Sequence, residues 1–176
     1  MTDLEEIIAG CISNNRVSQE KLYRQFYHGL HALCRQFFSD EQDIVSALNN
    51  GMLNIFKNIE SYDVTKGELF NWCYSIVRNA AITYLKSIKT INTVELDTAL
   101  QYDYCENPLI ELEFNDLFTY LDRLPPATRA VSSLYYRENF SINEISQQLN
   151  ISVGTVKWHL SECRSRLSKL LYKKAK

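Results

Sequence analysis

The residues with the clearest chemical pattern lie between Ser152 and Lys176. Apolar residues recur there at alternating steps of three and four, the spacing of an amphipathic helix: Val153, Val156, Leu160, Cys163, Leu167 and Leu170. At about 100° per residue, a second set points away from this stripe: Gly154, Thr155, Trp158, Ser161, Glu162 and Ser165. Three cations, Lys157, Arg164 and Arg166, flank that second face. Such a helix can present polar groups to base edges in a DNA major groove while its cations contact phosphates.

A short helix and a tight turn precede this segment and would position it. Ser141 can accept a hydrogen bond from the backbone near Glu144, and Glu144 can reach back, which predicts a capping box. An apolar face follows, formed by Ile142, Ile145 and Leu149. The chain turns at residues 150–151, and Ser152 is a candidate cap for the next helix. The pattern favours a helix-turn-helix, and the alternative is a plain helical hairpin with a solvated basic end.

Charge is unevenly distributed along the 176 residues. The formal net charge is only -2, so affinity for nucleic acid must come from local clusters of charge. Residues 90–122 contain no Lys or Arg, whereas the chain from Lys157 onward is strongly basic. The hydrophobic fraction of 45% and the charged fraction of 23% are ordinary for a globular protein.

The cysteine pattern indicates reduced thiols. Five cysteines occur without a C-x-x-C pair: Cys11, Cys34, Cys73, Cys105 and Cys163. An odd, unspaced set in a chain that starts MTDLEE, with no signal peptide, is typical of the cytoplasm. No apolar run approaches the length that spans a membrane. We therefore expect a cytoplasmic protein with no membrane segment, no metal and no cofactor.

Signatures of catalysis are missing from the sequence, which indicates that the protein is not an enzyme. It has no G-x-x-x-x-G-K-[ST], no H-E-x-x-H and no G-x-S-x-G motif. His28, His31 and Cys34 could suggest a metal site. Each step of three on a helix turns the side chain by about 60°, however, so all three do not converge easily on one ion.

Helical periodicity runs through most of the chain, and no segment has a period of two. The predicted helices cover residues 4–12, 18–38, 41–61, 69–89, 109–124 and 128–136, followed by the pair within 141–171. Gly51, inside a helix, predicts close packing or a bend, and Gly67 fits a turn in the polar loop 61–68. Residues 90–108 are acidic and lack periodicity, which predicts a flexible linker. The expected fold is all-α, with helical domains at 1–89 and 109–176.

The helix predicted over residues 69–89 mixes aromatic and polar side chains. Its aromatic members are Phe70, Trp72, Tyr74 and Tyr84, and its polar and cationic members are Asn71, Arg78, Asn79, Lys86 and Lys89. Aromatic rings beside cations suit unstacked bases. The alternative is that Trp72, Ile76 and Ala80 are core residues at helical spacing.

The C-terminal half resembles the C-terminal domain of extracytoplasmic-function sigma factors, members of the sigma-70 family. In that family an L-P-x-x-x-R-x-V-x-x-L helix precedes an E-I-x-x-x-L helix and an S-x-G-T-V-K recognition helix. The matching residues here are Leu124, Pro125, Arg129, Val131, Leu134, Glu144, Ile145, Leu149, Ser152, Gly154, Thr155, Val156 and Lys157. LuxR-type regulators carry a similar recognition helix.

The N-terminal half extends the resemblance. LFNWCYSIVRNAAITYLK is similar to the family segment that reads and melts the upstream edge of the transcription bubble. Trp72, Ile76, Asn79, Leu85 and Lys86 fall on matching positions, and Leu69 takes the place of the usual Phe. The preceding LNNGMLNIFKNIESYD resembles the helix that binds the polymerase clamp.

The resemblance implies an alternative sigma factor that binds RNA polymerase core, through its β′ clamp and β flap, and directs promoter-specific initiation. The residues expected at the upstream promoter element are Ser152, Thr155, Lys157, Trp158, Ser161, Glu162, Arg164 and Arg166. Those expected at the downstream element are Ser61, Tyr62, Asp63, Lys66, Asn71, Trp72, Arg78, Asn79 and Lys86. Those expected to contact core polymerase are Asp43, Ser46, Asn49, Asn50 and Asn54. An anti-sigma factor is a further partner that the family implies.

The chain departs from the family pattern on the clamp-binding helix and on the recognition helix. Ser46, Asn49 and Asn50 stand where relatives usually carry Asp, Glu or Gln, which predicts weaker charge-assisted contacts with the clamp. Thr83 replaces a usual Asp. Trp158 stands where relatives carry a small or polar residue, which predicts an unusual promoter preference through apolar contact with a thymine methyl or a sugar.

Two other functions stay open at this point. A LuxR-like helix-turn-helix regulator would bind its operator tightly without joining polymerase. A protein-interaction module, such as an anti-sigma partner, would leave no specific footprint on DNA.

Overall fold

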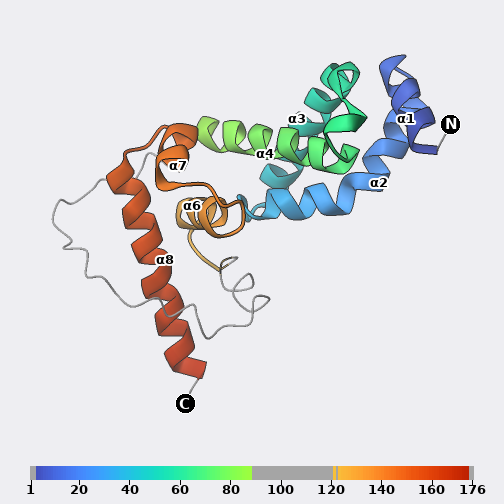
Figure 1. Ribbon diagram of the computed structural model, residues 1–176. Coiled ribbons are helices and arrows are strands. Elements are labelled where there is room, and N and C mark those ends of the chain that lie inside the picture. The colour runs from blue at the N-terminus through green and yellow to red at the C-terminus, as the bar shows by residue number, and fades with distance from the viewer. Residues whose placement is uncertain (1–2, 89–120, 122, 175–176) are drawn as a thin grey trace. The chain divides into compact units, whose positions relative to one another are not determined.

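Helices account for all regular structure in the part of the chain that the computed structural model describes, residues 3–88, 121 and 123–174 (Figure 1). The first half contains α1 (Asp3–Ile12), α2 (Arg16–Arg35), α3 (Glu41–Asn58) and α4 (Leu69–Ser87), with short 3-10 turns η1 (Ile59–Ser61) and η2 (Val64–Lys66). The second half contains α6 (Pro126–Tyr136), α7 (Ile142–Leu149) and α8 (Val153–Lys174). The all-α prediction is confirmed. The predicted linker at 90–108 and most of the predicted helix at 109–124 lie outside the described residues.

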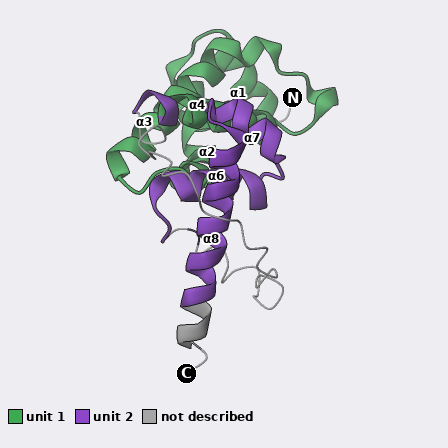
Figure 2. Cartoon of the chain, turned by 90° about the vertical axis from the view of Figure 1, so that its left-hand side faces the viewer, with its two compact units in different colours: residues 1–84 green, residues 85–176 purple. Residues whose placement is uncertain are grey.

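The chain divides into two compact units, residues 1–84 and 85–176 (Figure 2). In the first unit, α2 packs against α1 and α3. Their buried apolar residues include Ile7, Leu22, Leu30, Leu33, Ile44, Leu48 and Ile55. The expected helical stripes of α2 and α3 therefore form the core of this unit.

Polar side chains set where α2 and α3 begin. Asn15 Oδ1 accepts hydrogen bonds from the backbone amides of Val17 at 2.9 Å and Ser18 at 3.2 Å. Asp40 Oδ1 accepts from Gln42 N at 2.9 Å and Asp43 N at 3.3 Å. Because these caps satisfy amides that the first helical turn leaves unpaired, α2 begins two residues before its predicted start and α3 begins where predicted.

Gly51 is the point where α3 meets α4. A methyl group added at this glycine would lie 2.7 Å from Val77 Cγ2 and 2.9 Å from Val77 Cα. No side chain fits in that space, so the close packing predicted for Gly51 is confirmed.

The second unit is built on α6, α7 and α8, which all contact one another. Its buried apolar side chains include Val131, Leu134, Ile145, Leu149, Val156, Leu160 and Leu167. Helix α6 begins at Pro126, two residues before its predicted start, because proline is well tolerated at the first helical position.

The turn between α7 and α8 is held by local hydrogen bonds. Glu144 N donates to Ser141 Oγ at 3.2 Å and Ser141 N donates to Glu144 Oε2 at 2.8 Å, so the predicted capping box is confirmed. Asn150 ends α7 in the left-handed conformation, with φ 55° and ψ 46°. Ser146 Oγ donates to the carbonyl of Ile151 at 2.7 Å. The two helices therefore form the predicted helix-turn-helix.

Candidate nucleic-acid interface

Helix α8 begins with a pair of hydroxyl groups. Ser152 Oγ accepts from Thr155 N at 3.0 Å and lies 2.9 Å from Thr155 Oγ1. The cap predicted at Ser152 is confirmed. The outward position predicted for Thr155 is wrong, because its side chain is only 8% exposed and its hydroxyl is engaged by Ser152. Thr155 therefore helps to build the helix start and does not lie on its outer surface.

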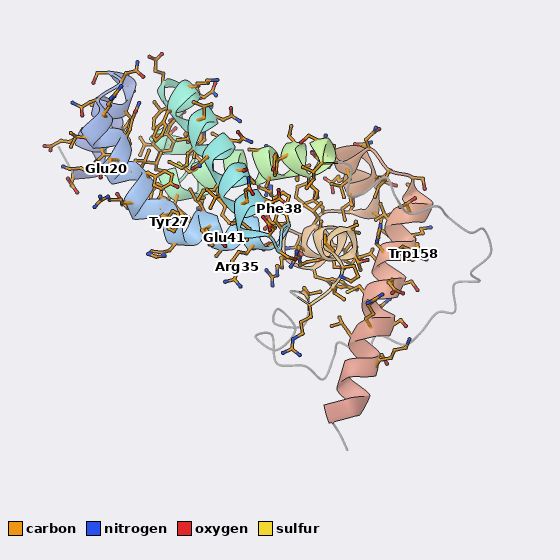
Figure 3. All side chains as sticks on the ribbon, turned by 180° about the vertical axis from the view of Figure 1, so that it is seen from behind. Glu20, Tyr27, Arg35, Phe38, Glu41 and Trp158 are labelled. Atoms are coloured by element: carbon orange, nitrogen blue, oxygen red, sulfur yellow. The ribbon has the colours of Figure 1, made fainter. Side chains whose placement is uncertain are left out.

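Gly154, Lys157, Trp158 and Ser161 form the outer face of the first two turns of α8. They are spaced at i, i+3, i+4 and i+7, so they line one side of the helix. Gly154 and Lys157 are exposed, and Trp158 and Ser161 are partly exposed. Figure 3 shows Trp158 on this helix. We call these four residues the α8 face.

Trp158 is anchored at one side by His159. The two rings meet edge to face, with centroids 4.8 Å apart and planes at 75°. His159 is only 1% exposed, and its Nδ1 lies 3.0 Å from Thr128 Oγ1 on α6. Burial lowers the pKa of His159 to about 4, so the ring is neutral near pH 7. Trp158 is thus half-buried, less exposed than the sequence predicts, and its ring packs against the buried His159.

Two of the predicted upstream contacts are partners of each other. Arg166 Nε donates to Glu162 Oε1 one helical turn away. Arg164 is half-buried, and it hydrogen-bonds to Tyr136, whose phenol pKa burial raises. These residues lie further along α8 than the α8 face, and their charges are partly occupied within the protein.

The loop before α4 is folded. Tyr62 Oη donates to the carbonyl of Gly67 at 2.9 Å, and the Tyr62 ring lies 5.7 Å from that of Trp72. Asp63 Oδ1 accepts from Thr65 N at 3.0 Å and from Thr65 Oγ1 at 2.7 Å, which lowers the pKa of this carboxyl. Gly67 has φ 138° and ψ 177°, a conformation that essentially only glycine adopts. The predicted turn at Gly67 is confirmed.

The remaining predicted loop residues are close to the surface. Lys66 Nζ lies 3.7 Å from Asp63 Oδ2 at an exposed site, and Ser61 Oγ donates to the carbonyl of Asn58 at 2.7 Å. Val64 is 75% exposed at the middle of the loop. The loop is therefore a compact structure with a rigid base and a solvent-facing tip.

Helix α4 follows this loop and carries polar residues along its outer side. Asn71, Asn79 and Lys86 are exposed, and Trp72 and Arg78 are partly exposed. The inward side of the helix is formed by Leu69, Cys73, Val77 and Ala80. Of the alternative core residues, Ala80 is buried, whereas Trp72 and Ile76 are only half-buried. Trp72 thus keeps part of its ring available beside the loop.

The residues predicted to contact polymerase lie on α3 and differ in availability. Asp43 Oδ1 accepts from Tyr84 Oη at 2.9 Å, a bond that raises the tyrosine pKa. Asn49 Oδ1 accepts from Tyr23 Oη at 3.2 Å. Ser46 is half-buried, and Asn50 and Asn54 are exposed. One carboxylate oxygen of Asp43 is therefore already hydrogen-bonded within the protein.

Leu53 is a surface residue that the periodicity did not identify. It lies on α3 between Asn50 and Asn54 and is 50% exposed. Leu53 falls outside the apolar stripe of its helix, so helical periodicity gives no signal for it. With Asn49, Asn50 and Asn54 it makes a surface that we call the α3 patch.

The three residues considered for a metal site diverge. His31 Nε2 lies 3.0 Å from Glu41 Oε1, and its ring lies 5.3 Å from that of Tyr27. Cys34 is fully buried, whereas His28 is exposed. The three side chains point in different directions because the helix rotates between them, so they cannot bind one metal ion together.

The described cysteines are buried core residues. Burial raises the pKa of the thiols to about 12 for Cys34 and Cys73 and to about 11 for Cys163. The pKa of Cys11 is raised as well. Thiols in this state act as apolar side chains.

Within the described ranges, no helix combines the length and the apolar character that crossing a bilayer requires.

Known proteins match both halves of the chain. The family model "Sigma-70 region 2" matches residues 22–90, and "Sigma-70, region 4" matches residues 114–167. The ECF RNA polymerase sigma factor SigM of Mycobacterium tuberculosis is 26% identical over 166 residues, covering 94% of this chain and 83% of the relative. SigM of Bacillus subtilis is 26% identical over 154 residues, covering 86% and 93%. The sigma factor RpoE from Bartonella quintana, solved in complex with the anti-sigma factor NepR, aligns with a TM-score of 0.45 and 18% identity over 87% of this chain and 96% of that chain.

The two regions occur in the order and combination of a sigma factor, and the relatives are matched over most of their length. A helix-turn-helix alone would be shared with other regulators, but region 2 would not. The chain is therefore a member of the extracytoplasmic-function sigma factors, in the sigma-70 family.

Proposed function

We propose that this sigma factor binds core RNA polymerase in the cytoplasm and directs it to specific promoters. The single observation that carries the proposal is the presence of both sigma regions in one chain, each matched by its own family model. Polymerase supplies the bond-making chemistry, and this chain supplies recognition and strand opening. An anti-sigma factor is a further partner that we propose for it.

The α8 face would dock on the upstream promoter element. Lys157 is exposed and can contact a phosphate, and Trp158 offers a partly exposed ring that packs against the buried His159. A ring held this way can pack against a thymine methyl or a sugar. Ser152 and Ser161 add hydroxyl groups near the base edges. Glu162, Arg164 and Arg166 would serve at the margin, because their charges already have partners in the protein.

The loop 61–68 and the outer side of α4 would act at the downstream element. Strand opening requires that a base be held outside the stack, and aromatic rings beside a polar loop can hold one. The Trp72 ring contacts the loop through Tyr62, with the two ring centroids 5.7 Å apart. Asn71, Arg78, Asn79 and Lys86 would contact the duplex and its backbone. This unit would therefore open the strands that the other unit helps to locate.

The α3 patch would bind the polymerase clamp. Asn49, Asn50 and Asn54 provide hydrogen-bonding groups without charge, and Leu53 provides exposed apolar area. An interface with few charges and a central apolar residue depends more on shape than on ion pairs. Asp43 and Ser46 would lie at the edge of this contact.

Reconstituted transcription tests the proposal. Core polymerase with this chain should start RNA at a defined promoter, and core alone should not. The isolated chain should bind the same DNA weakly, whereas a LuxR-like regulator would bind it tightly without core. If core neither retains the chain on purification nor changes its start sites, the proposal is wrong.

A further inference from the structure

Four of the five glycines in this chain have a reason within the fold. Gly67 needs its positive φ of 138°. At three others, an added methyl group would collide with a neighbour. The neighbours are Ser18 for Gly10, Phe70 Cζ at 2.8 Å for Gly29, and Val77 Cα at 2.9 Å for Gly51.

Gly154 has no such reason in the described part of the chain. A methyl group added there would meet Ser152 Oγ at 3.5 Å as its nearest neighbour, which is an ordinary contact distance. Its φ is not positive, so the backbone does not require glycine. The residue is in the first turn of α8, where glycine stabilises a helix less than alanine does. We therefore expect a methyl group at this position to leave the stability of the fold unchanged or slightly higher.

The position of Gly154 indicates why the absence of a side chain would be useful there. It begins the α8 face, one turn before Lys157 and Trp158, and it is exposed. Lys157 is a cation suited to a phosphate, and the Trp158 ring packs edge to face against the buried His159. A ligand that contacts both residues and extends toward the start of the helix would pass over Gly154, where a side chain would stand between it and the backbone.

We propose that Gly154 is a point of close approach between this chain and promoter DNA, where the absent side chain lets the duplex reach the backbone of α8. The inference rests on the proposed function, since it takes the α8 face as the surface that binds the upstream element. Glycine serves close backbone approach to a ligand in other proteins for the same steric reason. Gly154 is thus a positioning residue that sets how deeply the helix enters the groove.

Two substitutions test this proposal, because they should weaken DNA binding without lowering the stability of the protein. Gly154→Ala and Gly154→Met both introduce good helix formers of increasing length. We expect the thermal unfolding midpoint of the full chain to stay unchanged or rise by a few degrees. Promoter affinity of the complex with core should fall about fivefold for alanine and up to about a hundredfold for methionine, the range for losing one specific contact. Affinity of the chain for core should not change.

Gly51→Ala is the matched comparison. The same chemical change there drives a methyl group against Val77, so the unfolding midpoint should fall. If Gly154→Ala binds the promoter as the wild type does, or loses stability together with binding, the close-approach role is wrong. If the wild-type complex itself shows no promoter preference, the proposed function fails, and that outcome is distinguishable because it appears before any substitution.

Discussion

At the scale of single residues, Trp158 and His159 show how α8 joins its core to its surface. They are adjacent in the chain, yet His159 is 1% exposed and hydrogen-bonded to Thr128, whereas Trp158 lies partly in solvent. The ring contact between them joins the buried core to the surface of α8. A change in the charge of His159 should therefore be detected at Trp158.

We predict that the second unit loses stability in mild acid through His159. Its pKa in the folded chain is about 4, below the ordinary 6.5, so the unfolded chain binds the proton more readily. The stabilisation is fully present above about pH 6.5 and falls as the pH drops toward 4, with a slope of at most about 1.4 kcal/mol per pH unit. Trp158 fluorescence in a Trp72→Phe background measures the unfolding, and His159→Gln should flatten the slope. Replacing the exposed His28 with Gln should leave it unchanged.

Replacing Lys157 or Trp158 with alanine should change DNA binding in different ways. Lys157→Ala should weaken DNA binding equally across promoter sequences and reduce the salt slope by about one, as for the loss of one phosphate contact. Trp158→Ala should instead change the preference among upstream-element variants. Binding titrations at several salt concentrations distinguish the two, with the exposed Lys21→Ala as control. A uniform loss for Trp158→Ala would show that the ring acts by packing alone.

At the scale of elements, the loop before α4 combines a backbone conformation open only to glycine with a hydrogen-bonded base. Gly67 adopts a backbone conformation that costs other residues roughly 1–3 kcal/mol. Its carbonyl also accepts the Tyr62 hydrogen bond that closes the loop. The loop therefore keeps its shape only while both features are present.

Gly67→Ala should impair strand opening more than promoter binding. The substitution forces the loop out of its conformation, while α8 is unaffected and can still bind the upstream element. Permanganate reactivity of thymines in the promoter measures opening, and a template with a pre-melted bubble should restore transcription. Normal opening on duplex DNA would contradict the assigned role of the loop.

Leu53→Asp should weaken binding to core polymerase without unfolding the chain. The side chain is 50% exposed, so its replacement should change stability by less than about 0.5 kcal/mol. Val17→Asp is the control, because Val17 is also an exposed apolar residue of the first unit, at 62%. Equal losses in a core pull-down for both variants would rule out a specific contact at the α3 patch.

Sequence patterns predicted the helices well because the information is local. The stripe of α8 is buried at Val156, Leu160 and Cys163, and the capping box joins residues three apart. Helical periodicity wrongly predicted an exposed Thr155. The pattern counts a threonine as polar, and it does not show that its hydroxyl is hydrogen-bonded within the protein. It could not predict the bond between Tyr84 and Asp43 either, because those residues are 41 positions apart and only the folded structure brings them together.

The site was predicted less completely than the fold, for a related reason. Resemblance to a family gives the positions of expected contacts, but not whether each side chain is available to a partner. Asp43 and Glu162 were expected to face partners, yet each accepts a hydrogen bond from its own chain. Leu53 was missed because a single apolar residue outside a stripe carries no periodic signal.

At the scale of the whole molecule, the proposed function places two recognition surfaces on one promoter. The DNA helix repeats about every 10–10.5 base pairs, so the two elements must lie at a fixed rotation about its axis. Inserting five base pairs between them turns one element by about half a turn. We predict that promoter-specific transcripts are then lost, whereas changes of one base pair cause a graded decrease. Unchanged transcription would show that one unit alone selects the promoter.

The turn between α7 and α8 has a consequence for evolution. Its shape depends on Asn150, on the Ser146 bond to Ile151 and on the Ser152 cap, and these bonds involve no residue of the α8 face. Mutation can therefore exchange the outward residues while the angle of the helix persists. Duplicated copies of such a gene can diverge toward new promoters by a few changes, each made on a scaffold that already folds.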